Sequence, residues 1–142
     1  MEKREIVTDA SVVAKWFLDE EFSEKARFIR DSLILQKLTI SVPSLLFYET
    51  LNALRYTHLY DASELASVAR SLSKYGFNIH EPRGRLYEET ARTSQKYNIS
   101  IYDAAYLALA SYLHTTLYTA DLELVQKAPR HVKHIRQLPT CD

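Results

Sequence analysis

The sequence predicts an α/β protein in which a parallel sheet is covered by helices on both faces. Strand-favouring runs alternate with amphipathic helical runs along the chain, which is typical of that class. The first strand, at 6–8, is β-branched throughout and passes into a helix with no turn between them, which suits the middle of a parallel sheet. The 142 residues include only two glycines and four prolines, which leaves little room for flexible linkers, so we expect one domain over 1–142.

The first half of the chain carries two of the expected strands. Asp9 closes the first of them, and Pro43 suits the first position of a helix that follows the second. The acidic loop at 19–21 separates the first two helices. The elements expected here are a strand at 6–8, a helix at 11–18, a capped helix at 23–30, a strand at 38–42, a helix continuing over 45–58, and a helix at 62–73 ending near Gly76.

The second half continues the alternation. Asn98 is suited to stop a helix, and Ser100 to Asp103 has the form of a capping box before a very apolar helix. The elements expected here are a strand at 77–80, helices at 84–97 and 104–113, a strand at 116–119, a short helix at 122–127 and an edge strand at 132–135.

Charge and cysteine content limit the possible functions. The 18 lysines and arginines balance the 18 aspartates and glutamates, so any nucleic acid must be held by local basic patches rather than by a positive field over the whole protein. The single cysteine, Cys141, cannot form an internal disulfide, which fits a reducing compartment. The chain starts without a signal-peptide core, and its most apolar stretch, 104–113, is shorter than the roughly 20 residues that span a bilayer. We therefore expect a soluble, cytoplasmic protein.

Four acids occupy positions that this topology can bring together. Asp9 and Asp121 directly follow strands, Asp103 opens a helix and Glu49 lies within one. Parallel strands end at one edge of the sheet, where α/β proteins bind ligands. Carboxylates gathered there repel one another and have raised pKa values unless a hard cation such as Mg²⁺ or Mn²⁺ binds between them. The pattern therefore predicts a divalent metal site.

Each acid also has a purely structural interpretation. Asp9 and Asp121 can serve as helix N-caps, and Asp103 can complete the capping box. Glu49 lies opposite the apolar stripe of its helix, so its position alone favours a solvated face. Capping does not exclude a role in a site.

Four segments, in this order, resemble the motifs of the PIN domain family, specifically its VapC-type toxin ribonucleases. In the first segment, Asp9 stands at the start of a helical run, and in the second, Asn52 follows Glu49 by three residues. The third opens the apolar helix and the fourth closes a strand. These segments are 9–17, 43–54, 101–110 and 117–121, and the resemblance covers nearly the whole chain.

The resemblance implies a sheet of about five strands in the order 3-2-1-4-5 and a metal-dependent RNA endonuclease using Mg²⁺ or Mn²⁺. Asp9, Glu49, Asp103 and Asp121 map to the catalytic metal-site acids. Supporting roles map to Ser11, Thr119 and Asn52. Family members usually pair with an antitoxin and commonly form homodimers.

Positive side chains are the candidates for contacts to RNA phosphates, although each can equally be an ordinary solvated cation. These candidates are Lys15, Arg55, Arg83 and Arg85. Two other functions compete with this one. A receiver-like phosphoryl switch would need an acid on the strand at 77–80, which has none, and the other is a catalytically inactive PIN-like module that binds protein or RNA.

Overall fold

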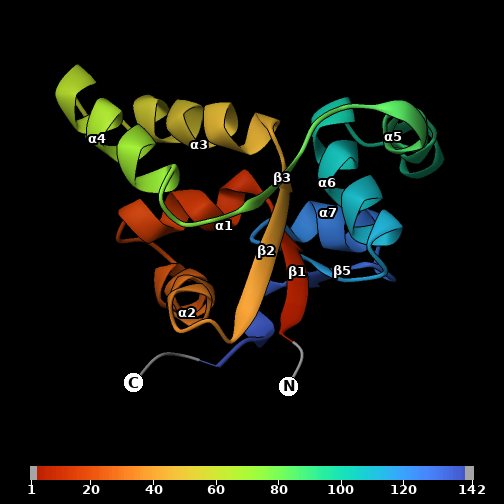
Figure 1. Cartoon of the computed structure of the whole chain (residues 1–142), viewed down its shortest axis with the longest axis horizontal. Coiled ribbons are helices and arrows are strands. Elements are labelled where there is room, and N and C mark those ends of the chain that lie inside the picture. Colours follow the sequence, from red (N-terminus) through yellow and green to blue (C-terminus); the bar gives the residue numbers. More distant parts are fainter. Residues whose placement is uncertain (1–2, 140–142) are drawn as a thin grey trace.

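The computed structural model describes residues 3–139 and contains a parallel sheet of five strands in the order β3-β2-β1-β4-β5 (Figure 1). The predicted class and strand order are therefore confirmed. All four pairings are parallel, so the carboxyl ends of the strands lie along one edge. The strands are β1 (Arg4–Thr8), β2 (Leu38–Pro43), β3 (Asn78–His80), β4 (Leu117–Thr119) and β5 (Val132–His134).

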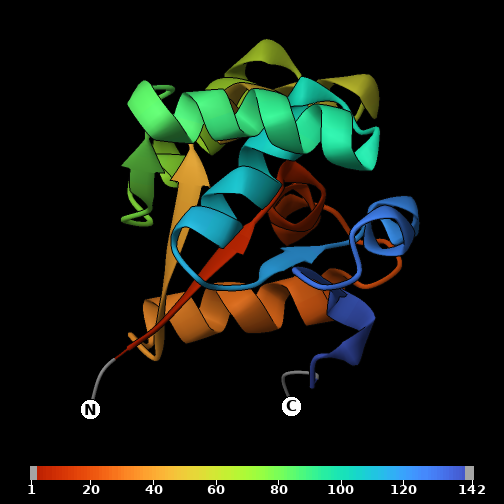
Figure 2. The same cartoon turned by 90° about the vertical axis from the view of Figure 1, so that its right-hand side faces the viewer.

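Helices cover both faces of the sheet and make a three-layer structure. In Figure 1 the helices α1 to α4 lie on one side of β1 and β2, while α5 and α6 lie on the other. The helix α6 packs against the central strands, and α5 lies over its outer side (Figure 2). The helices are α1 (Ala10–Ala14), continued by a 3₁₀ turn at Lys15–Phe17, α2 (Ser23–Ile34), α3 (Leu45–Tyr56), α4 (Ala62–Leu72), α5 (Gly84–Tyr97), α6 (Ile101–Tyr112) and α7 (Leu122–Lys127); a second 3₁₀ turn, Ile135–Gln137, follows β5.

The strand β1 lies in the middle of the sheet, where its apolar residues are buried on both faces. Ile6 and Val7 are fully buried; Ile6 lies beside Ile40 of β2, and Val7 lies beside Leu117 of β4. A strand buried on both faces is the usual core of a parallel sheet. This arrangement places Asp9, the next residue after Thr8, at the middle of the carboxyl edge.

Three local predictions differ from the structure. Pro43 ends β2 instead of opening α3. The hydrogen bond from this end of β2 to β3 is donated by the N–H of the next residue, Ser44, to the His80 carbonyl, so the missing N–H of Pro43 removes no hydrogen bond of the sheet here. The helix α2 has no side-chain cap, because Phe22 occupies its N-cap position, and the Ser23 hydroxyl donates to the Leu18 carbonyl in the preceding loop. The helix expected at 11–18 is replaced by α1 and the 3₁₀ turn.

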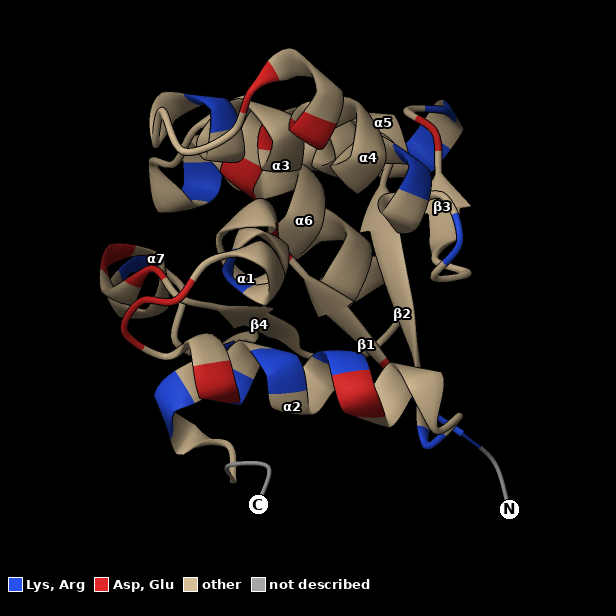
Figure 3. Cartoon of the chain, turned by 90° about the vertical axis from the view of Figure 1, so that its left-hand side faces the viewer, with Lys and Arg blue, Asp and Glu red and all other residues tan. Residues whose placement is uncertain are grey.

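Charges of both signs are interspersed on the surface. Both positive and negative residues occur along α2 (Figure 3). Within residues 3–139, no helix has the length and apolar character that crossing a membrane requires.

Candidate active site

Asp9 is the most buried acid of the site, and three donors hold its carboxylate. The Ser11 hydroxyl donates to Oδ1 at 2.5 Å, and the Thr119 hydroxyl donates to Oδ2 at 2.5 Å. The backbone N–H of Val12 also donates to Oδ1, so Asp9 is both the N-cap of α1 and a member of the site. Its side chain is fixed between β1 and β4, with 6% of the residue exposed.

The two hydroxyls also connect Asp9 to the segment that follows β4. The N–H of Ala120 donates to Ser11 Oγ at 3.0 Å, and the N–H of Asp121 donates to Thr119 Oγ1 at 3.1 Å. Asp121 is exposed and caps α7 through its Oδ1. We call Asp9, Ser11, Thr119 and Asp121 the strand-end group, since all four lie where β1 and β4 end.

Two further acids come from helices. Glu49 of α3 is half-buried, and its Oε1 accepts a hydrogen bond of 2.7 Å from the Tyr106 hydroxyl of α6. Asp103 lies one turn before Tyr106 in the first turn of α6, where the Ser100 hydroxyl caps the helix by accepting from the Asp103 N–H. We call Glu49, Asp103 and Tyr106 the helix-borne group. Glu49 is thus only partly exposed to solvent.

The acids of the two groups lie close enough to interact electrostatically. Burial raises the pKa of Asp9 to about 6, and the charge of Asp103 adds to this rise. Burial and then the charge of Asp103 also raise the pKa of Glu49, although the Tyr106 hydrogen bond opposes them. The pKa of Asp103 is raised by burial and then by the charge of Asp121. Asp103 is therefore the acid that interacts electrostatically with the other three.

Tyr106 is a site residue that the sequence alone did not identify. Its ring is 1% exposed, and burial, followed by the hydrogen bond to Glu49 and the charges of nearby acids, raises the pKa of its hydroxyl far above the usual range. The hydroxyl therefore stays protonated and acts as a donor. Its position three residues after Asp103, on the same face of a helix, was the available signal.

The donor chemistry of this site fits a hard divalent cation, although the acids do not form a ready-made cage. Oxygen ligands with several negative charges are what Mg²⁺ and Mn²⁺ prefer. Burial raises the pKa values of Asp9, Glu49 and Asp103, and the charge of a neighbouring acid adds to each rise, so a bound cation would favour their ionised forms. Among residues 3–139, no group of three or more His, Cys, Asp or Glu side chains is arranged to hold a metal ion as the side chains stand.

The remaining predicted residues lie at or beyond the margins of the site. Asn52 and Arg55 are exposed and line a shallow groove together with Glu49. Lys15 is not a free cation, because its ammonium is bound to the Glu20 carboxylate at 2.9 Å and to the Glu21 carbonyl at 2.7 Å. The other two cations, Arg83 and Arg85, line a separate hollow beside β3.

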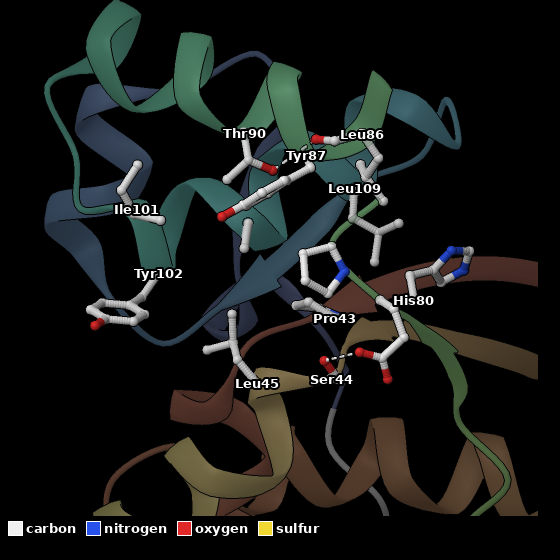
Figure 4. A pocket seen from close by; sticks show the side chains of 13 residues that line it. Pro43, Ser44, Leu45, His80, Leu86, Tyr87, Thr90, Ile101, Tyr102 and Leu109 are labelled. Atoms are coloured by element: carbon white, nitrogen blue, oxygen red, sulfur yellow. Dashed lines mark hydrogen bonds between the residues drawn. The ribbon is translucent and has the colours of Figure 1, made fainter. Parts of the chain in front are cut away.

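An apolar pocket adjoins the acids but contains none of the four (Figure 4). Leu45 lines it from the start of α3, one turn before Glu49, and Tyr102 lines it from the start of α6, directly before Asp103. Pro43 and Tyr87 also line the pocket, whose walls come from β2, α3, α5 and α6. The surface beside the acids is therefore apolar on this side.

Together, the fold and the site define a class: a three-layer α/β protein with a cluster of acids at the carboxyl edge of a parallel sheet. The model of the PIN domain matches residues 6–129. The chain belongs to the PIN domain family. A relative, Ribonuclease VapC3 of Pyrobaculum aerophilum, is 28% identical over 130 residues, covering 87% of this chain and 95% of the relative.

Solved structures share the fold. FitAcB from Neisseria gonorrhoeae matches with a TM-score of 0.71 and 18% identity, covering 94% of this chain and 99% of that one. A toxin–antitoxin complex from Klebsiella pneumoniae matches with a TM-score of 0.68 and 17% identity, covering 92% and 97% of the two chains. A protein from Pyrobaculum aerophilum matches with a TM-score of 0.65 and 24% identity, covering 95% and 93%.

Proposed function

We propose that this protein is a metal-dependent endoribonuclease and the toxin of a VapBC-type toxin–antitoxin pair, with the whole chain forming one PIN domain. The observation that carries the proposal is the electrostatic linkage of Asp103 to Asp9, Glu49 and Asp121. The name of the relative, a VapC ribonuclease, supports RNA as the substrate. The structural neighbour described as a toxin–antitoxin complex supports an antitoxin as the partner, and we further propose a homodimer.

The four acids would hold one or more Mg²⁺ or Mn²⁺ ions. When bound, such an ion lowers the pKa of a water and neutralises charge that develops on the scissile phosphate. Hydrolysis would join the water oxygen to phosphorus as one phosphorus–oxygen ester bond breaks, and the proton released by the water would balance the one taken up by the leaving oxygen.

The protein's own groups have the task of orientation. Ser11 and Thr119 fix both oxygens of Asp9, so this ligand is positioned before the substrate arrives. The Val12 N–H adds the partial positive charge of a helix N-terminus, which favours the ionised form of Asp9. Arg55 is the exposed cation closest in sequence to Glu49, and we assign it a contact to an RNA phosphate.

The test compares Asp9→Asn with Asp61→Asn. Both residues are aspartate N-caps, but Asp61 caps α4 through Glu64, outside the acid site. We expect Asp9→Asn to lower the rate of RNA cleavage in Mg²⁺ or Mn²⁺ by at least about 100-fold, since losing a metal ligand should cost more activity than losing a residue that only orients one. Asp61→Asn should cleave at the wild-type rate.

Two results would count against the proposal. Cleavage that survives EDTA would exclude a metal-dependent reaction. Wild-type protein that binds RNA without cutting it, under conditions where the divalent ion binds, would favour the inactive PIN-like module instead.

A further inference from the structure

Glu49 differs from the other acids in being held by another side chain across a helix interface. Its Oε1 accepts from the Tyr106 hydroxyl at 2.7 Å, and this bond joins α3 to α6. Glu49 is otherwise on the half-exposed face of α3, where a glutamate has several accessible rotamers. The tyrosine bond selects one of them.

The tyrosine has no freedom to seek another partner. The ring is 1% exposed and packs in the core beneath the site, so its hydroxyl is desolvated. A buried hydroxyl left without a partner is unfavourable, because its hydrogen bonds to water are lost and not replaced. Rotation of Glu49 away from the site therefore costs the protein this hydrogen bond, and the side chain stays where the tyrosine holds it.

The bond also determines which oxygen of Glu49 is available. With Oε1 engaged by Tyr106, Oε2 is the oxygen left free for another partner, and the charge of Asp103 acts on this carboxylate. Tyr106 and Asp103 are three residues apart on α6, so a single rigid helix places both the second acid and the group that orients the first.

We propose that Tyr106 is a positioning residue that orients Glu49 for binding of the divalent cation. This inference rests on the proposed function, because it assigns Glu49 to the same cation. Tyr106 contacts neither RNA nor the ion in this scheme; it acts only through Glu49. Partners of metal ligands typically change metal affinity about 10- to 100-fold when they are removed.

The experiment measures Mn²⁺ binding to the RNA-free protein by electron paramagnetic resonance. Tyr106→Phe removes the hydroxyl and keeps the ring, and we expect it to weaken Mn²⁺ binding about tenfold. The matched control is Tyr118→Phe, which removes the hydroxyl of another buried tyrosine, one bonded to Arg4 at the far end of β1. This control should bind Mn²⁺ within about twofold of the wild type, since the Tyr118 hydroxyl bonds to Arg4 and to none of the four acids, while the contact of Tyr118 with Asp9 is made by its backbone carbonyl and is kept in the variant.

Two further variants separate positioning from stability. Glu49→Asp keeps the charge but shortens the side chain by one methylene, so the carboxylate cannot reach the tyrosine; we expect a loss similar to that of Tyr106→Phe. In a Glu49→Gln background, Tyr106→Phe should change Mn²⁺ binding by less than about twofold, because no charged ligand remains to be oriented. If Tyr106→Phe fails to fold, Tyr106→Met, which also lacks the hydroxyl, takes its place in the same comparison of the wild-type and Glu49→Gln backgrounds.

The outcomes distinguish this inference from the proposed function. If the wild type binds Mn²⁺ but Tyr106→Phe and Glu49→Asp bind it equally well, the positioning role is wrong and the nuclease proposal stands. An equal loss from Tyr106→Phe in the wild-type and Glu49→Gln backgrounds also overturns it, since the tyrosine would then act without Glu49. If the wild type binds no Mn²⁺, both proposals fail.

Discussion

The strand-end group and the helix-borne group supply the same chemistry but are held in place in opposite ways. Asp9 is buried and fixed by three donors, two of them side chains, that belong to α1 and β4. Glu49 is half-buried and has one side-chain donor, Tyr106, while Asp103 depends on the first turn of α6. The strand-end group is rigid because its residues lie at the ends of two paired strands and are hydrogen-bonded to one another. The helix-borne group depends on where α3 and α6 lie relative to each other, and a small shift between these helices changes the distance between Glu49 and the other acids.

The largest effect should come from weakening the strand-end group. Thr119→Val is nearly isosteric but removes the donor to Asp9 Oδ2 and the acceptor for the Asp121 N–H. We expect RNA cleavage to fall about 10- to 100-fold. Thr119→Ser keeps the hydroxyl and should restore most of the rate. Cleavage by Thr119→Val at the wild-type rate would show that the strand-end group does not need its hydroxyls.

The burial of Asp9 predicts an unusual pH dependence in metal-free protein. Its pKa is raised from 3.8 to about 6, so the folded state binds more protons than the unfolded state between these values. The stabilising contribution is thus fully present below pH 3.8 and is lost as the pH rises through 6, by at most about 3 kcal/mol. Urea unfolding in EDTA at pH 4.5 and 7.5 measures this loss. Asp9→Asn should lessen it, and an unchanged loss in that variant would assign the effect to other groups.

A smaller effect is expected from the helix-borne group. Asp103→Asn removes the charge that raises the pKa of both Asp9 and Glu49. We expect Mg²⁺ or Mn²⁺ to raise the melting temperature of the wild type, and to raise that of Asp103→Asn by less. Thermal unfolding with and without the ions gives both values. An equal rise in the two proteins would remove Asp103 from the metal site.

The smallest effect should come from Asn52. This side chain is exposed in the shallow groove beside Glu49 and has no hydrogen bond among the described residues. Asn52→Ala should change the cleavage rate by less than about twofold, since exposed substitutions seldom exceed about 0.5 kcal/mol. A large loss would mean that Asn52 binds RNA or a second ion.

The sequence predicted the strand-end group better than the helix-borne group for a physical reason. Asp9 and Asp121 follow strands whose ends must share one edge of a parallel sheet, so topology alone brings them together. Where Glu49 points depends on the rotation of α3 against α6, and residue spacing within α3 does not contain this information. Its helical position favoured solvent, and only the family resemblance indicated a role in the site.

Other differences arise from contacts between segments distant in sequence or from competition for one group. The positive charge of Lys15 was predicted to be available for RNA, but the loop that follows folds back and places Glu20 against it. Pro43 is as acceptable at the end of a strand as at the start of a helix, so composition could not place the boundary. The helix at 23–30 was predicted to be capped, but its N-cap position falls on Phe22, and the Ser23 hydroxyl donates to the Leu18 carbonyl.

The contact between Asp9 and Thr119 joins residues 110 positions apart. During synthesis on the ribosome, Asp9 therefore emerges long before the side chain that completes its surroundings. A nascent chain without β4 has only part of its central sheet and no assembled group of acids. A protein that cuts RNA while it is being translated would threaten its own message, and in this fold that activity has to wait until most of the polypeptide has been made.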